Sequence, residues 1–362
     1  MKKLPLLVLV IILTLTIFQF SCHSPTAPKQ NTPPDTTSNN FTWQTFTFGA
    51  SNAGSSHLAD VAIVSDSDIW CVGAIYLDSA DGEPDPNAYN AVHWNGSNWQ
   101  LERIKTNACG GVEYPPIQTI FAFSSNDILF AHIDGSISHY NGIDFTNDCS
   151  LITQLNGSAN KIWGESRNDF YVVSSSGFIA HSQNGSWQKM ESGTTIDLRD
   201  IWGSSDGQTV WACGYSNDYS RSILLNYDGT SWKTPWVKQP SGTKPPYQYF
   251  ISSQWASDNF LYVAADIGIF RTPLNGSDST KEILSLSSGP HSIRGSADNN
   301  IAIALDDGSV WHYNGASWFK ETNSVQSKPL YSIAVSANTI VAVGFDATSM
   351  PTKGIILIGR RN

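Results

Sequence analysis

One motif recurs along nearly the whole chain. Its clearest copy reads IWGSSDGQTVW at residues 201–211, followed by LLNYDGTSW at 224–232. Weaker copies begin at residues 61, 120, 162, 254, 293 and 333. A repeat of roughly 40 to 60 residues built from short β segments cannot bury both of its faces alone. The sequence therefore predicts a β-propeller, in which neighbouring repeats cover one another.

Each repeat carries signals for four strands. Asn-Gly or Asp-Gly pairs stand between the last two strands, as a tight hairpin requires, because both of its central residues need a positive φ. The second strands, such as TVWACG at 209–214 and FLYVAA at 260–265, are apolar on both faces. This pattern is typical of a sheet sandwiched between neighbours. We therefore expect an all-β fold of seven four-stranded antiparallel blades.

The seventh repeat has three strand segments up to Ile358, and no segment for a fourth strand follows them. Residues 41–48 (FTWQTFTF) look like the missing strand, because Trp43 and Gln44 match Trp99 and Gln100 of the first repeat. We expect this segment to complete the blade formed by residues 330–359. Such a closure removes the free sheet edges that invite aggregation.

The first 22 residues form a separate segment. A positively charged start, an apolar run over residues 4–20 and Ser21 before Cys22 resemble a bacterial lipoprotein signal peptide. Gln19 and Phe20 depart from the usual lipobox, so a plain signal peptide or an uncleaved anchor helix is the alternative.

Residues 23–40 are rich in Pro, Thr and Asn and predict a disordered tether in front of a propeller domain at 41–362. On the lipoprotein interpretation, lipid is attached at Cys22. The protein would then be exported and anchored in the cell envelope, at the outer membrane or the cell surface, and would meet the membrane only through its lipid.

The cysteines beyond the leader divide into two pairs. Cys71 and Cys213 lie in apolar strand segments and are expected to be buried. Cys109 and Cys149 lie in polar connections at either end of the second repeat, where an exported protein can join them in a disulfide. Since the chain has no CxxC pair, nothing indicates a zinc site, and we expect neither a metal nor a cofactor.

Charge excludes one class of partner. Charged residues make up 14% of the chain, against roughly 25% in an average globular protein, and the formal net charge is −10. Lysine and arginine form no cluster, whereas phosphate binding depends on clustered positive charge. Nucleic acid is therefore not expected as a partner, and we expect a monomer.

Long connections gather on one side of the predicted disc. They span residues 77–90, 105–116, 215–222, 235–250 and 345–353, whereas the tight hairpins occupy the other side. A face that alone accumulates long loops suits recognition. Aromatic rings beside hydrogen-bonding groups suit a sugar or a peptide, although each ring could instead pack its loop onto the disc. The candidate ligand-binding residues are Tyr89, Tyr114, Tyr219, Trp236 and Tyr247.

Two other sets of residues suggest metal sites at first sight. Four histidines occupy the same place in their blades, so they would be far apart around a ring, and we expect each to bond its own blade. An acidic loop could hold calcium, but its spacing matches no complete EF-hand, so a solvated loop is favoured. The histidines are His93, His139, His181 and His312, and the acidic loop contains Asp78, Asp81, Glu83 and Asp85.

The repeat resembles the IWGSSxDVWxVG and HYNGxSW propeller repeats of many bacterial exported proteins and lipoproteins, and more loosely the two-component-regulator and kelch propellers. This resemblance covers residues 41–362 and implies the fold, but propellers host binding, scaffolding, hydrolysis and lyase chemistry alike. Our leading hypothesis is a surface-anchored, non-catalytic binding or scaffold module that recognises a glycan or a protein through its long-loop face.

The alternative is a carbohydrate-active propeller enzyme, of the glycoside hydrolase or glycosyl-transferring type. It would need carboxylates from different blades at the mouth of the channel, roughly 5 to 10 Å apart. The candidates are Asp60, Glu113, Asp200 and Asp266. The sequence contains no GxSxG, no HExxH and no phosphate-binding loop that would point to a common hydrolase or nucleotide enzyme.

Overall fold

The computed structural model describes residues 36–49, 52–106, 109–155, 158–204, 207, 209–238, 250–266, 268–274 and 280–362. The predicted signal segment with Cys22, most of the predicted tether, and Tyr247 lie outside these residues. No helix within the described residues is long and apolar enough to cross a membrane.

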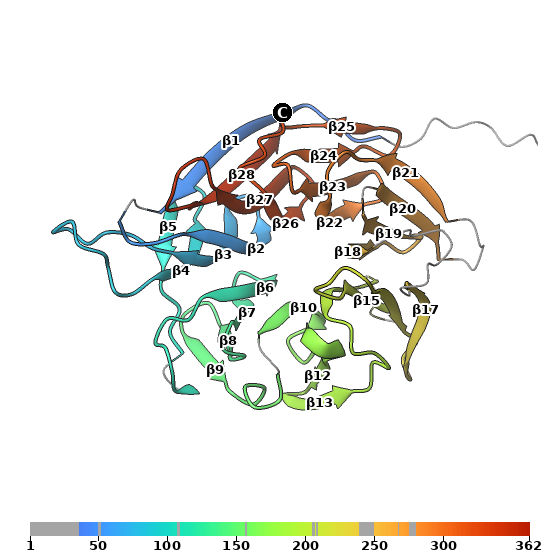
Figure 1. Cartoon of the computed structure of the whole chain (residues 1–362), viewed down its shortest axis with the longest axis horizontal. Coiled ribbons are helices and arrows are strands. Elements are labelled where there is room, and N and C mark those ends of the chain that lie inside the picture. Colours follow the sequence, from blue (N-terminus) through green and yellow to red (C-terminus); the bar gives the residue numbers. More distant parts are fainter. Residues whose placement is uncertain are drawn as a thin grey trace, which may run out of the picture. The chain divides into compact units, whose positions relative to one another are not determined.

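Residues 41–361 form seven sheets of four antiparallel strands, as predicted, and the first strand of each sheet lies toward the centre of the ring (Figure 1). We number the blades in chain order. Blade 1 consists of β2 (His57–Ser65), β3 (Asp68–Ile75), β4 (Tyr89–Trp94) and β5 (Trp99–Glu102). Blade 2 consists of β6 (Ile117–Ser124), β7 (Asp127–His132), β8 (Ile137–Tyr140) and β9 (Phe145–Asp148). Blade 3 consists of β10 (Ala159–Ser166), β11 (Asp169–Ser174), β12 (Ile179–Gln183) and β13 (Ser186–Met190), with the short 3-10 turn η2 (Ser175–Gly177) between β11 and β12.

Blades 4 to 7 continue this order. Blade 4 consists of β14 (Leu198–Gly203), β15 (Val210–Tyr215), β16 (Ser222–Tyr227) and β17 (Trp232–Lys238), and blade 5 of β18 (Ile251–Ala256), β19 (Phe260–Ala265), β20 (Gly268–Pro273) and β21 (Lys281–Ser285). Blade 6 consists of β22 (Pro290–Ala297), β23 (Asn300–Leu305), β24 (Val310–Tyr313) and β25 (Trp318–Lys320). Blade 7 consists of β26 (Leu330–Val335), β27 (Thr339–Asp346) and β28 (Lys353–Arg361), together with β1 (Phe41–Phe48).

Strand β1 closes the ring. It pairs with β28 along its whole length, so that Phe46 lies opposite Ile356 and Trp43 opposite Gly359. In Figure 1 the blue β1 lies beside the orange-red β28 at the outer edge of blade 7. The predicted closure by the N-terminal strand is therefore confirmed.

The repeated Trp-Gly pair of the first strands has a packing role. The ring of Trp163 in blade 3 lies where a side chain on Gly203 of blade 4 would stand, 2.1 Å from the position of a Cβ. Trp255 of blade 5 covers Gly295 of blade 6 in the same way, at 2.9 Å. Both tryptophans are buried. In these two blade pairs, close packing of the Trp requires a Gly in the next blade.

The tryptophans that follow the hairpin pairs also pack between blades. Trp99 of blade 1 contacts Phe46 and Phe48 of β1 with ring centroids 5.9 and 6.4 Å apart. Trp187 of blade 3 donates its indole N–H to Asp148 of blade 2 at 2.7 Å. These side chains join neighbouring blades rather than face solvent as ligand platforms.

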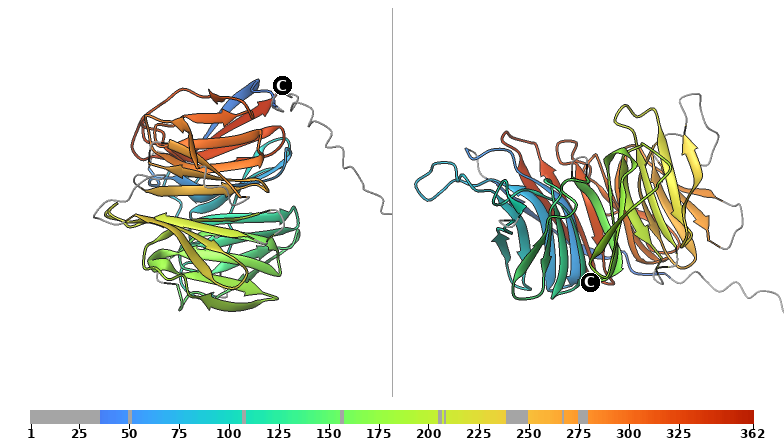
Figure 2. Two further views of the ribbon diagram at one scale, coloured as in Figure 1. Left: turned by 90° about the vertical axis from the view of Figure 1, so that its right-hand side faces the viewer. Right: turned by 90° about the horizontal axis from the view of Figure 1, so that it is seen from below.

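The strand connections lie on two faces. The turns between first and second strands and between third and fourth strands form one face, which we call the short-hairpin face. The remaining connections form the long-loop face. In the right-hand view of Figure 2 the C-terminus lies on the lower side, whereas the connection after β3 stands out near the upper side.

Both ends of the described chain lie on the short-hairpin face. Thr37 donates its backbone N–H to Asn314 at 3.1 Å and its hydroxyl to the carbonyl of Asn299, and both asparagines are in hairpin turns of blade 6. The backbone N–H of Asn362 donates to the carbonyl of Asn40 at 2.9 Å. The chain therefore enters and leaves the propeller at neighbouring points.

One predicted connection begins later than expected. Residues 235–238 belong to β17, although we had assigned them to a loop starting at Pro235. Pro235 can lie within the strand because the register shifts between Leu224 and Asn226, which leaves a bulge at this point of the edge strand. A proline needs no ladder hydrogen bond at such a position.

Candidate functional site

A bulge recurs at the same place in all seven blades. In each first strand, one residue near the long-loop end has no partner on the second strand, and the pairing resumes one residue later. A bulge of this kind re-aims a side chain. The seven bulged residues are Ala59, Gln118, Asn160, Arg199, Ser252, His291 and Tyr331.

These seven residues line a cavity of about 620 Å³ at the long-loop end of the central channel. We call this cavity the mouth. The bulged position carries seven different residue types, whereas the position two residues later is apolar in six of the seven blades. Because the same backbone geometry accepts all seven types, packing of the blade does not dictate their identity.

Three aromatic side chains, Tyr215, Tyr331 and Phe345, line the mouth, and other rings pack against two of them to form two aromatic walls. On the side of blade 4, Tyr215 stacks with Tyr219 at 5.5 Å between ring centroids, and Phe250 contacts both rings. On the side of blade 7, Tyr331 contacts Phe345 at 5.5 Å and His291 at 5.3 Å. The walls therefore offer flat apolar surface beside polar groups.

Tyr219 is held in an exposed position. Its side chain is 57% exposed and its φ is +56°, a value that is costly for a residue other than glycine. The neighbouring Asp218 fixes the loop by accepting hydrogen bonds from the Ser216 hydroxyl at 2.5 Å and the Ser220 backbone at 3.1 Å. These hydrogen bonds lower the pKa of Asp218 to about 2. The ring is thus presented to solvent by a fixed loop.

The floor of the mouth is a charged layer, and Asp60 forms one half of it. Its carboxylate accepts hydrogen bonds from Lys161 of blade 3 at 2.6 Å, Thr119 of blade 2 at 2.7 Å and Ser332 of blade 7 at 2.6 Å. Burial alone would raise the pKa of Asp60, but the charge of Lys161 and these hydrogen bonds outweigh it and lower the pKa. Asp60 therefore stays ionised and connects four blades.

Asp200 forms the other half of the floor. The guanidinium of Arg294 in blade 6 contacts both carboxylate oxygens, at 2.6 and 2.9 Å. The Ser253 hydroxyl of blade 5 donates to the same carboxylate at 2.6 Å. Burial would lower the pKa of Arg294, but the charge and hydrogen bonds of Asp200 outweigh it and raise the pKa. Together, Asp60 and Asp200 connect all seven blades.

The charged layer separates the mouth from an apolar stretch of the channel. Lys161 and Arg294 also border a second cavity of about 160 Å³, whose other walls include Ile120, Phe121 and Ile333. A ligand in the mouth therefore meets polar groups at the floor and does not reach this apolar stretch without breaking the ion pairs.

Of the four carboxylates considered for catalysis, Asp60 and Asp200 line the mouth. Asp60 and Asp200 are held in the ion pairs of the floor. Glu113 forms an ion pair with Lys105 on the connection between blades 1 and 2. Asp266 lies in the turn after β19, where its backbone N–H donates to Phe250 at 2.8 Å. The arrangement resembles a structural clamp more than a glycosidase site.

The structure describes four of the five candidate ligand-binding aromatics, and these four belong to different strands and connections. Tyr219 stacks on Tyr215, which lines the mouth. Tyr89 is covered by the guanidinium of Arg103, 3.9 Å from its ring centroid, and Tyr114 is half-buried on the connection between blades 1 and 2. Trp236 lies on the outer strand β17 and packs against the core between blades 4 and 5. Tyr247 lies outside the described residues.

The repeated histidines bond within their own blades. On the third strand, the imidazole of each contacts a residue at the start of the second strand. The contacts are His93 with Asp68 at 2.9 Å, His139 with Asp127 and His181 with Asp169 at 2.7 Å, and His312 with Asn300 at 2.9 Å. The described residues contain no group of three or more potential metal ligands, and in the acidic loop Asp85 forms an ion pair with Arg103.

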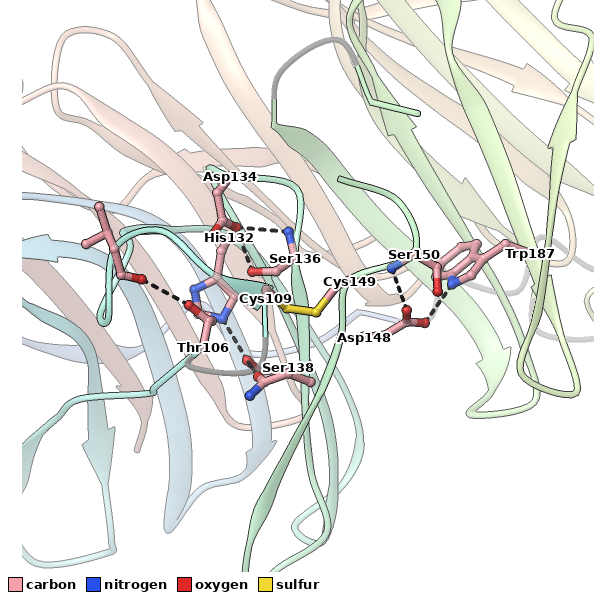
Figure 3. The surroundings of a disulfide bond; sticks show 12 residues. Thr106, Cys109, His132, Asp134, Ser136, Ser138, Asp148, Cys149, Ser150 and Trp187 are labelled. Atoms are coloured by element: carbon pink, nitrogen blue, oxygen red, sulfur yellow. Dashed lines mark hydrogen bonds between the residues drawn. A yellow bond between two sulfur atoms is a disulfide. The ribbon is translucent and has the colours of Figure 1, made fainter. Parts of the chain in front are cut away.

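A disulfide joins Cys109 to Cys149, the two cysteines paired in the sequence analysis (Figure 3). It links the connection between blades 1 and 2 to the connection between blades 2 and 3. The sequence separation is 40 residues, and constraining a loop of this length in the unfolded chain contributes about 4 kcal/mol. The disulfide therefore fixes two connections of the long-loop face to each other.

His132, close to this disulfide, makes stability depend on pH. Its imidazole contacts the Pro115 carbonyl at 3.2 Å and the Ser138 hydroxyl at 2.8 Å, and burial lowers its pKa to about 4 (Figure 3). The pKa of His312 is also lowered to about 4 by burial. Between pH 6.5 and 4 the unfolded chain therefore binds protons that the folded chain does not bind, and stability falls as pH falls.

We expect each of these two histidines to reduce the free energy of unfolding by about 2 kcal/mol between pH 7 and pH 5. Urea unfolding at the two pH values measures the change. His132→Gln should remove its share, whereas His93→Gln, at a half-buried histidine, serves as the control. An unchanged pH dependence in His132→Gln would contradict this assignment.

Sequence reasoning missed most residues of the mouth. Arg199, His291 and Tyr331 stand inside strands and were not among the candidate residues of the sequence analysis. Alignment of the seven repeats contains a signal for these residues. The position two residues before the start of each motif copy carries a different residue type in every repeat. Arg294 was visible in the sequence, since IRG at 293–295 stands where blades 3 and 4 carry IWG.

Comparison with known proteins identifies the fold. No known protein family and no curated protein matches the chain. Among solved structures, YCF48 bound to D1 peptide is 15% identical with a TM-score of 0.64, over 92% of this chain and 100% of its own. YCF48 from Cyanidioschyzon merolae is 13% identical with a TM-score of 0.62, over 88% of this chain and 98% of its own.

The WD40 β-propeller domain of Doa1 is 12% identical with a TM-score of 0.61, over 89% of this chain and 98% of its own. These likenesses show the fold alone. In all, 1138 solved chains match, so a shared propeller does not decide what this one does.

Proposed function

We propose that residues 41–362 form a non-catalytic binding module that holds a segment of another protein in the mouth of its long-loop face. The observation that carries this proposal is the ring of seven unlike side chains on seven identical bulges. The backbone geometry of the bulge repeats in every blade, whereas the residue type at the bulge does not. This is expected where a ligand, rather than the packing of the fold, determines the side chains that line the mouth.

The walls and the floor support binding without catalysis. Tyr215, Tyr219 and Tyr331 supply large, rigid rings with polar ends, the side chains that dominate the affinity of protein interfaces. The carboxylates Asp60 and Asp200, which an enzyme would need in a reactive state, are neutralised by their ion pairs. A bound segment would therefore be held rather than cleaved.

A protein ligand is favoured over a glycan by the comparison with YCF48, whose similar propeller was solved with a peptide bound. The test is to select peptides from a displayed random library on the purified protein, immobilised through its C-terminus so that the mouth stays free. We expect selected peptides to lose binding in Tyr219→Ala and Tyr331→Ala.

The control variant is Ile143→Ala, because Ile143 is 84% exposed on the short-hairpin face. Peptides that bind all three variants equally would place the binding site elsewhere and contradict the proposal. A library that yields no peptide, together with specific binding on a glycan array that requires Tyr219, would assign the mouth to a sugar instead.

We also propose that the segment before the propeller anchors the protein in the cell envelope through a lipid on Cys22. The support is the sequence pattern of residues 1–22 and the tether-like composition that follows. Metabolic labelling with a tagged fatty acid tests it, because Cys22→Ala should abolish the label. Labelling that survives this substitution would refute lipid attachment at Cys22.

A further inference from the structure

The lining of the mouth is electrically balanced. Lys161 and Arg294 are paired with the carboxylates of the floor. Arg199 is held by Asp197 at 3.5 Å and by the side-chain oxygen of Asn217, and its guanidinium lies 4.9 Å from the ring of Tyr215. The cations of the lining therefore already have partners, and an anionic ligand would have to compete with them.

One carboxylate at the edge of the mouth is different. Asp306 contacts His291 at 3.2 Å, its side chain is 64% exposed, and no Lys or Arg of the described residues pairs with it. Burial raises the pKa of both Tyr215 and Tyr331, and the negative charge of Asp306 adds to the shift at each of them. Asp306 therefore lies near both aromatic walls.

The surrounding face is strongly acidic. Among its described connections, the long-loop face carries thirteen carboxylates and four lysines or arginines. The described turns of the short-hairpin face carry five carboxylates and one arginine. An excess of negative charge around a cavity attracts cations and speeds the association of a basic partner.

We propose that the mouth accepts a lysine or arginine side chain of a basic polypeptide segment, placed between the walls of Tyr215 and Tyr331 and beside Asp306. The aromatic faces attract the cation and cover its alkyl stem, and the carboxylate neutralises its charge. The acidic connections around the mouth hold the neighbouring basic residues of the same segment. This inference rests on the proposed function and names the chemistry of its ligand.

The test uses two labelled peptides of equal length, one of lysine, glycine and serine and one with glutamate in place of lysine. We expect the lysine peptide to bind and to weaken steeply with added salt, whereas the glutamate peptide does not bind. Fluorescence anisotropy measures both affinities. Asp306→Asn and Tyr331→Leu should each weaken the lysine peptide about 3- to 10-fold.

The matched control is Asp144→Asn, which removes the same charge from an exposed turn of the short-hairpin face. It should change the affinity by less than about 2-fold, because its distance from the mouth exceeds the screening length of ordinary buffer. Equal effects of Asp306→Asn and Asp144→Asn, binding of the glutamate peptide, or no binding of the lysine peptide would overturn the inference.

The outcomes for the two proposals are distinguishable. If the displayed library yields acidic or uncharged peptides that still require Tyr219 and Tyr331, the mouth binds protein segments but not basic ones. In that case only the inference about charge fails. If no selected peptide requires these tyrosines, the proposed function fails as well.

Discussion

Replacing Asp200 with serine should destabilise the protein by about 3 to 5 kcal/mol. Arg294 is almost completely buried, and the substitution leaves its charge without a counterion in the floor of the mouth. Serine is the residue that blades 5, 6 and 7 carry at the same position, so the change itself fits the backbone. The free energy of unfolding in urea measures the loss.

A second substitution separates the charge from the packing. Arg294→Met keeps much of the side-chain volume without the charge, so the double variant Asp200→Ser with Arg294→Met should recover most of the loss and remain within about 2 kcal/mol of the natural protein. If Asp200→Ser alone costs less than about 1 kcal/mol, or if the double variant is no better than the single one, the ion pair does not stabilise the floor as we describe.

Deleting residues 36–48 should abolish cooperative unfolding. The deletion removes the whole of β1, exposes the edge of β28, and uncovers buried surface on both sides of blade 7, since Trp43 packs toward blade 6 and Phe46 toward blade 1. The loss is comparable with the total stability of an ordinary domain, about 5 to 15 kcal/mol. Calorimetry and near-ultraviolet circular dichroism detect it.

A shorter deletion provides the control. Removing residues 36–40 alone eliminates the contacts of Thr37 with blade 6 but leaves β1 intact, so it should lower the melting temperature only slightly. Addition of the free peptide 41–48 should restore part of the native signal to the longer deletion by refilling the edge of β28. Unchanged melting after the loss of β1 would show that the ring does not depend on this closure.

The fold could be predicted because several independent sequence patterns all indicated a propeller. The hairpin pairs, the apolar second strands and the Trp-Gly motif recur at the same register, and the orphan strand at 41–48 had only one incomplete blade to join. Repetition multiplies weak local signals, so even the degraded repeats could be assigned.

The candidate site was harder to predict because it depends on contacts across the ring. Asp60 and Lys161 are 101 residues apart and belong to blades that are not neighbours, so no local pattern joins them. The bulges were also invisible, because a single extra residue in one strand leaves the apolar pattern of the motif almost unchanged. The ion pairs of the charged floor therefore emerged only from the structure.

The surroundings of individual loop aromatics were not predictable from the sequence for a different reason. Position in a long connection was used as a sign of exposure, but Tyr89 gained a covering guanidinium from Arg103 and Trp236 belonged to a strand. Among the four described candidates, Tyr219 is the one that is largely exposed, at 57%, and it stacks on Tyr215 of the mouth. Exposure depends on what folds back onto a side chain, and the sequence of one loop does not contain that information.

The contact between Asn40 and Asn362 on the short-hairpin face places both ends of the described chain on the side of the propeller opposite the mouth. A surface, carrier or fused domain joined directly at residue 36 or residue 362 would adjoin the face opposite the mouth. The mouth would then point away from the molecule joined there. The two ends are also close enough for a short peptide to join them, so new termini could be opened in a hairpin turn without changing which side faces the ligand.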